Sequence, residues 1–110
     1  MTKRVEFLPA ALEEVEEGAA WYRERDPRVS KAFAAEVDWA IGLVAESPRR
    51  WPAYHHGTHR VLLEKYPYSL VYRDEPDRVL VVAMAHFKKK PGYWHQRLKS
   101  GKRSPTSGRS

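Results

Sequence analysis

Side chains able to take part in RNA chemistry are concentrated near the C-terminal end of the chain. Cleavage of RNA by its own 2′-hydroxyl needs a base for that proton, cations for the phosphoryl oxygens and an acid for the departing oxygen, but no metal ion. His86, Lys88, Lys89 and Tyr93 are the candidate catalytic residues for such a reaction. His86 is the candidate base or acid, because imidazole exchanges protons near neutral pH.

A second set of residues could bind a nucleic acid or another large target. It comprises Arg60, Arg73, Lys90, Trp94, His95 and Arg97. The two arginines on predicted neighbouring strands could hold phosphate, while Tyr93 and Trp94 could stack on unpaired bases. Structural roles are equally open: the arginines could pair with Glu64 or with helix carboxylates, and a lysine run is often only a solvated strand end.

The residue types present argue against a metal, a cofactor or a membrane. His55, His56 and His59 have no carboxylate at a recognisable ligand spacing, so no metal site is expected. The absence of cysteine excludes disulfides, thiolate zinc sites and a cysteine nucleophile, and it fits the cytoplasm. No apolar run is long enough to span a membrane, and residues 1–9 do not resemble a signal peptide.

Charge is distributed unevenly along the chain. Residues 1–46 contain six Lys or Arg against ten Asp or Glu, whereas residues 78–110 contain nine Lys or Arg and no acid. The net charge of +6 therefore arises mainly from the last third. Such a segment favours nucleic acid, an acidic protein or an anionic surface as partner.

The first half of the chain is expected to form a strand and two helices. Residues 3–8 alternate apolar and charged side chains, as in a short strand. Apolar residues at spacings of three and four then predict a helix that begins at Pro9. Residues 26–27 predict a break with an N-cap before a second helix, which residues 47–48 should end. A turn this short should place the helices antiparallel, as a hairpin.

The second half is expected to form a loop and three strands. The loop should cover residues 49–58, the strands residues 60–66, 68–73 and 78–85, and a hairpin turn residues 74–77. The last strand is apolar on both faces, which predicts a central strand covered on both sides.

Several aromatic residues are expected to pack rather than to react. Trp21, Trp39 and Trp51 are expected in the packing of the domain, and Tyr68 and Tyr72 on a face of the sheet. Trp94 lies among charged residues and is expected at the surface.

The order β-α-α-β-β-β predicts an α+β domain, in which a helical hairpin packs on a small, mostly antiparallel sheet. The predicted domain covers residues 1–97. Residues 98–110 are expected to be a basic, disordered tail, because the chain has no apolar residue from Ser100 onward.

The blocks of sequence that carry these elements resemble RelE/ParE toxins of the plasmid-stabilisation type. The blocks are a Leu-Pro opening into an acidic helix, Trp21-Tyr22, residues 45–52, residues 60–73, Ala85-His86 and residues 88–94. They occur in the family's order over about residues 3–97. The resemblance implies a growth-inhibiting toxin with the fold predicted above, held by an acidic or amphipathic antitoxin encoded by a neighbouring gene.

The resemblance implies two alternative activities. Members like RelE cut messenger RNA on the ribosome, whereas members like ParE poison DNA gyrase. Ribonuclease members carry an arginine after the tyrosine of the third strand, where this chain has Ser69. They also carry a glycine and a Lys-Arg pair at the end of the last strand, where this chain has Phe87, Lys88 and Lys89. These departures favour gyrase inhibition. An inactive member that only binds the antitoxin is a third hypothesis.

Overall fold

The computed structural model describes residues 2–103, and the side chains of residues 2–99. Its elements are β1 (Val5–Phe7), α1 (Pro9–Arg25), α2 (Pro27–Glu46), the 3-10 helix η1 (His55–Gly57), β2 (His59–Leu62), β3 (Tyr68–Asp74), β4 (Val79–His86) and α3 (His95–Arg103). The predicted order β-α-α-β-β-β and the α+β class are confirmed. The structure has two further helices that the sequence pattern did not predict, η1 within the predicted loop and α3.

The four strands form one sheet in the order β1-β4-β3-β2. The edge strand β1 runs parallel to β4, while β3 is antiparallel to both β4 and β2. Tyr68 at the start of β3 faces His86 at the end of β4, and a bulge interrupts this pairing between Val71 and Tyr72. The prediction of a central last strand is confirmed, since β4 lies between two neighbours and is buried from Val79 to Ala85.

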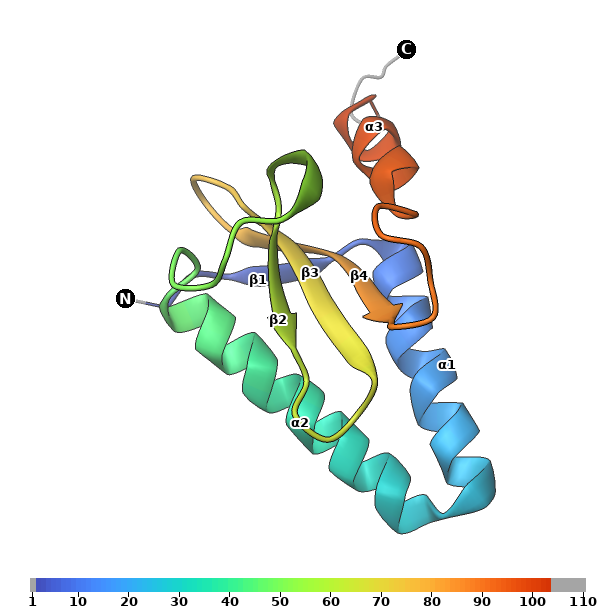
Figure 1. The fold of residues 1–110 in the computed structure, drawn as a ribbon. Coiled ribbons are helices and arrows are strands. Elements are labelled where there is room, and N and C mark those ends of the chain that lie inside the picture. Colours follow the sequence, from blue (N-terminus) through green and yellow to red (C-terminus); the bar gives the residue numbers. More distant parts are fainter. Residues whose placement is uncertain (1, 104–110) are drawn as a thin grey trace.

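The two long helices form a hairpin whose turn is fixed by local chemistry. The side chain of Asp26 accepts a hydrogen bond from the backbone N–H of Arg28, and Pro27 occupies the first position of α2. The helices meet at this turn and diverge as a V toward the sheet (Figure 1). Helix α2 ends before Ser47, as predicted.

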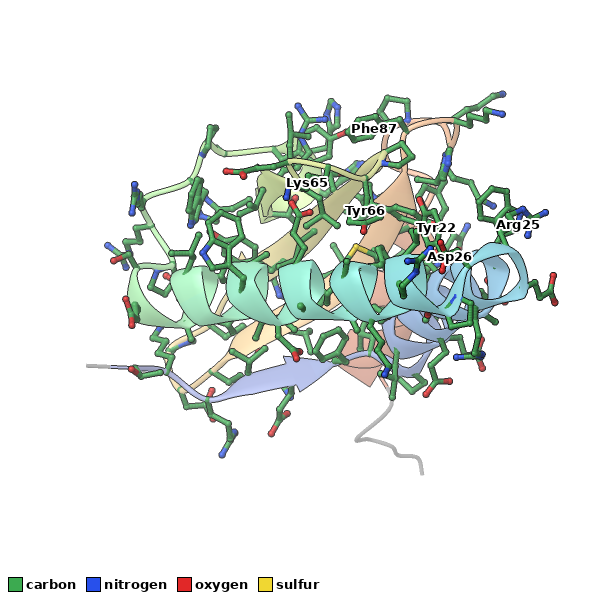
Figure 2. All side chains as sticks on the ribbon, turned by 90° about the horizontal axis from the view of Figure 1, so that it is seen from below. Tyr22, Arg25, Asp26, Lys65, Tyr66 and Phe87 are labelled. Atoms are coloured by element: carbon green, nitrogen blue, oxygen red, sulfur yellow. The ribbon has the colours of Figure 1, made fainter. Side chains whose placement is uncertain are left out.

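The main core lies between the hairpin and one face of the sheet. Phe33 of α2 is fully buried, and its ring packs against those of Tyr22, Tyr66 and Tyr68 at centroid distances of 5.2–5.3 Å. Figure 2 shows Tyr22 and Tyr66 pointing toward each other beside α2, where their centroids are 5.2 Å apart. Aromatic pairs at this separation add to the free energy gained from burial. Tyr72 is also fully buried, as predicted.

The opposite face of the sheet is covered by the C-terminal segment. Val71, Val82, Ala83 and Ala85 form a second core there with Trp94 and Leu98. The expectation that Trp94 lies at the surface is therefore wrong: its indole is 1% exposed. A strand that is apolar on both faces needs a cover on each, and the C-terminal segment supplies the second.

Residues 98–103, which were expected to belong to the disordered tail, form part of α3. Leu98 is 6% exposed within the second core, and α3 continues to Arg103. The apolar surface left by β4 accounts for this difference, because it gives Leu98 a place to pack. Residues 104–110, the remainder of that tail, lie outside the described residues.

Two of the three tryptophans expected to pack are largely exposed. Trp21 on α1 is 52% exposed and Trp39 on α2 is 47% exposed. Helical spacing alone did not indicate this exposure. Trp51 packs against the main core as expected. None of the helices in the described part of the chain is long and apolar enough to cross a membrane.

Candidate functional site

A hollow that we call the basic cleft lies where the turn after β4 passes over the ends of β2 and β3. Its volume is about 200 Å³. It is lined by Tyr54, Arg60, Ser69, Ala85, His86, Phe87, Lys89, Lys90, Pro91, Tyr93 and Trp94. Three Lys or Arg side chains and one histidine thus line a hollow whose described walls contain no carboxylate.

The basic cleft brings together six of the ten residues predicted to form a site: Arg60, His86, Lys89, Lys90, Tyr93 and Trp94. The sheet register explains this gathering, because the start of β3 pairs with the end of β4 and so brings the following turn beside β2. Arg60 stacks on Tyr54, with its guanidinium carbon 4.2 Å from the ring centroid. This contact orients the guanidinium while leaving its charge available to an anion.

Tyr93 and Arg97 are held by a carboxylate that the sequence analysis did not single out. The hydroxyl of Tyr93 donates to Oε2 of Glu14 at 2.6 Å, and the guanidinium of Arg97 binds both oxygens of Glu14 at 2.9 and 2.8 Å. Glu14 Oε1 also accepts the backbone N–H of Met84 at 3.0 Å. This network, which we call the Glu14 cluster, fastens the C-terminal segment to α1 and to β4.

The environment of Tyr93 keeps its hydroxyl protonated. Burial raises the pKa of Tyr93 well above its ordinary value of 10.0, and the hydrogen bond to Glu14 raises it further. Hydrogen bonding to Glu14 also raises the pKa of Arg97. A tyrosine in this position is therefore a poor proton-transfer group near neutral pH.

His86 occupies the wall between the basic cleft and a second hollow. Its Nδ1 accepts the backbone N–H of Lys88 at 3.1 Å, and its ring meets the ring of Tyr68 edge to face at 5.0 Å. The accepting role at Nδ1 implies that a neutral ring carries its proton on Nε2. Lys88 lies on the other side of this wall from Lys90, so the three consecutive lysines do not serve one hollow.

Arg73 does not join the site. It lies near the end of β3 opposite to Tyr68, and its guanidinium binds the carboxylate of Glu75 at 2.5–2.7 Å. Its partner is therefore neither Glu64 nor a helix acid, the two alternatives from the sequence. His95 also lies apart from the basic cleft: its ring stacks on that of His56 at 3.5 Å with an interplanar angle of 8°.

The second hollow, which we call the aromatic groove, runs between α1 and the ends of β3 and β4. Its volume is about 470 Å³. It is lined by Glu14, Glu17, Gly18, Trp21, Tyr22, Pro67, Tyr68, Met84, His86, Lys88, Lys89 and Tyr93. The exposed Trp21 was the signal that could have indicated it, because a large exposed apolar side chain often marks an interaction surface.

No group of histidine, aspartate and glutamate side chains in residues 2–99 is arranged to hold a metal ion. The triplet of histidines around η1 is dispersed by its contacts: His59 binds the carbonyl of Trp51 through Nδ1, and His56 stacks on His95. The site therefore offers cations, hydroxyls and aromatic rings as its binding groups.

A helical hairpin on this four-stranded sheet defines the RelE/ParE toxin-like fold. The fold is similar to a chain of the chromosomal ParDE TA system from P. aeruginosa, with a TM-score of 0.68, 10% identity, and coverage of 77% of this chain and 96% of that one. It is also similar to a chain of the toxin-antitoxin complex RelBE2 from Mycobacterium tuberculosis, with a TM-score of 0.52, 23% identity, and coverage of 78% and 99%.

The family is established by sequence. Residues 5–91 match the family model for the ParE toxin of the type II toxin-antitoxin system parDE. No protein of curated function matches the chain in sequence. The chain belongs to the ParE toxin family, and it is a toxin of a type II toxin-antitoxin system.

Proposed function

We propose that this toxin stops growth by poisoning DNA gyrase and does not itself cut nucleic acid. The observation that carries the proposal is the Glu14 cluster. A ribonuclease would direct the hydroxyl of Tyr93 at a phosphodiester, but here that hydroxyl is bound to a carboxylate of α1 at 2.6 Å. Burial and Glu14 also raise the pKa of Tyr93 away from the range useful for proton transfer.

The wall of the basic cleft gives further support. Ser69 stands where ribonuclease members carry an arginine, and a hydroxyl cannot replace a guanidinium in stabilising charge on a phosphoryl group. Inhibition of a large protein–DNA complex needs a shaped and charged surface rather than a catalytic set.

The direct test is a cleavage-complex assay with purified toxin, gyrase, supercoiled plasmid and ATP. We expect linear DNA after detergent and protease treatment, and no cutting of messenger RNA in a ribosomal translation reaction. Tyr93→Phe should retain the gyrase effect, because the phenol has no chemical role. Defined new ends in the messenger, lost in Tyr93→Phe and in His86→Gln, would instead identify a ribosome-dependent ribonuclease. No effect in either assay would identify a toxin that retains only antitoxin binding.

We also propose that an amphipathic antitoxin neutralises the protein in the cytoplasm by occupying the aromatic groove. Trp21, Tyr22 and Met84 offer apolar contacts along the groove, and its charged lining residues, Glu14, Glu17, Lys88 and Lys89, can pair with the polar face of an amphipathic segment. One structural relative comes from a TA system and the other from a toxin-antitoxin complex. Co-expression with the neighbouring gene product should restore growth, and Trp21→Ala should weaken the complex more than Trp39→Ala on α2. Equal weakening would argue against the groove.

A further inference from the structure

Arg60 of the basic cleft differs from most other arginines among residues 2–99 in having no acidic partner. Arg78 and Arg97, for example, are bound to carboxylates within the fold. By contrast, Arg60, Lys89 and Lys90 form no ion pair with any described side chain of residues 2–99. Three cations around a hollow without carboxylates repel one another, and a bound polyanion would relieve that repulsion.

The lining of the basic cleft fits a phosphodiester. Ser69, which is only 5% exposed, lines the cleft and places a small polar side chain beside the cations. Hydroxyls, lysines and arginines are common ligands of phosphate oxygens.

The aromatic residues of the cleft favour contact with the backbone over recognition of bases. Trp94 is buried in the second core. The ring of Tyr93 already contacts the guanidinium of Arg97 and the ammonium of Lys89, at 5.2 and 5.4 Å from its centroid, so neither aromatic ring is available to stack on a base. Phe87 is the exposed aromatic residue of the lining, at 55%, and Figure 2 shows it at the outer edge of the molecule, away from α2. The accessible groups are thus charges and one apolar edge, which suits binding without sequence preference.

We propose that the basic cleft binds the phosphate backbone of duplex DNA, so that the toxin holds the DNA in the gyrase complex as well as gyrase itself. This role rests on the proposed function, whereas the binding of DNA to the free toxin does not. Arg60, oriented by Tyr54, and the two lysines of the turn would neutralise phosphates of one strand. Phe87 would lie against the adjoining sugar.

The salt dependence of DNA binding by the purified full chain tests this inference. The probe is a labelled duplex of about 20 base pairs, titrated at about 50–300 mM salt, where each neutralised phosphate contributes about −0.9 to the slope of log K against log[salt]. The double variant Lys89→Gln, Lys90→Gln should reduce the magnitude of this slope by about 1.8. At 0.1 M salt, this change corresponds to DNA binding about 60-fold weaker than that of the wild type. Arg60→Gln should lower it by about 0.9.

The matched control removes the same charge elsewhere. Arg23 and Lys31 are exposed on the helical hairpin and line neither hollow. Changing both to glutamine should leave the slope within about 0.5 of the wild-type value. Equal loss in the control and the cleft variant would overturn the inference, because it would show binding to the net charge alone. Single-stranded RNA bound at least tenfold more tightly than the duplex would also overturn it.

The gyrase assay separates the two proposals. Gyrase trapping by the wild type, with unchanged DNA binding in the cleft variant, would refute the cleft and keep the gyrase target. Cleft-dependent DNA binding without trapping would refute the gyrase target and keep the DNA site. Trapping that falls together with DNA binding in the cleft variant would support both.

Discussion

Replacing Glu14 with alanine should release the C-terminal segment from the rest of the fold. The substitution removes the acceptor for the Tyr93 hydroxyl, for the Arg97 guanidinium and for the Met84 backbone N–H. The side chains of the ion pair are 16% and 22% exposed, so it is largely but not fully desolvated. Breaking a buried pair costs about 3–5 kcal/mol, and partial exposure places this one at about 2–3 kcal/mol. For a domain of this size, that corresponds to a melting temperature lower by roughly 10–20 °C.

Urea denaturation followed by circular dichroism would measure this loss, and hydrogen exchange would locate it. The amide of Arg97, which bonds to the carbonyl of Trp94, should exchange faster before the sheet amides do. Glu13→Ala is the matched control, because Glu13 is exposed on the same helix. Glu14→Gln keeps an acceptor oxygen and should lose about half as much, roughly 1–1.5 kcal/mol.

A double-mutant cycle between Glu14→Ala and Arg97→Ala isolates the ion pair. We expect the two losses to be strongly non-additive, with a coupling energy of about 1–2 kcal/mol. If Glu14→Ala were within about 0.5 kcal/mol of the Glu13→Ala control, the cluster would not stabilise the segment. The contact between Glu14 and Tyr93 would then no longer count against a catalytic role for Tyr93.

Three further changes have defined outcomes. Trp94→Ala empties the centre of the second core and should cost about 3–5 kcal/mol in urea denaturation; a loss below about 1 kcal/mol would mean that the indole is not buried. Burial raises the pKa of Asp74, but hydrogen bonds and charge from Lys3 and Arg49 more than offset that effect and hold the pKa below 3.8. The contribution of the ionised Asp74 to stability is therefore complete at neutral pH, and it is lost as the pH falls below 3.8 through the folded-state pKa. Lys3→Met should therefore reduce stability at neutral pH and flatten this acid limb, and an unchanged limb would contradict the assignment. Burial, followed by the charges of His56 and Lys99, lowers the pKa of His95 below 6.5. The contribution of neutral His95 to stability is therefore complete above that pH and decreases as His95 becomes protonated. His95→Gln should flatten the dependence of the melting temperature on pH between about pH 7.5 and 5.5.

The sequence by itself determined the order of the elements, because the relevant signals are local. The pair Asp26 and Pro27 fixes the turn of the hairpin through one side-chain cap and one constrained backbone angle. The apolar run of β4 required a central, doubly covered strand, and the structure has one. Order and periodicity depend on residues a few positions apart, so they can be recognised without knowledge of the fold.

Most of the candidate site was also named in advance, but not the role of each residue. Six of the ten predicted residues line the basic cleft. Residue type shows that a lysine or an arginine can bind an anion, but it does not show whether a carboxylate already occupies that charge. Arg73, bound to Glu75, and Arg60, stacked on Tyr54 and without an acidic partner among the described residues, are the same residue type on adjacent strands.

Only the tertiary structure decided which charges are already neutralised and which side chains are covered. Glu14 and Arg97 are 83 positions apart in the chain, and no local pattern links them. The polar neighbours of Trp94 in sequence suggested exposure, but its neighbours in space are the apolar residues of β3 and β4. Burial and ion pairing depend on which segments the fold brings together. The basic cleft is therefore predictable from sequence in its residue types, whereas its free charge and the immobilised Tyr93 follow from the packing of α1 and the C-terminal segment against the sheet.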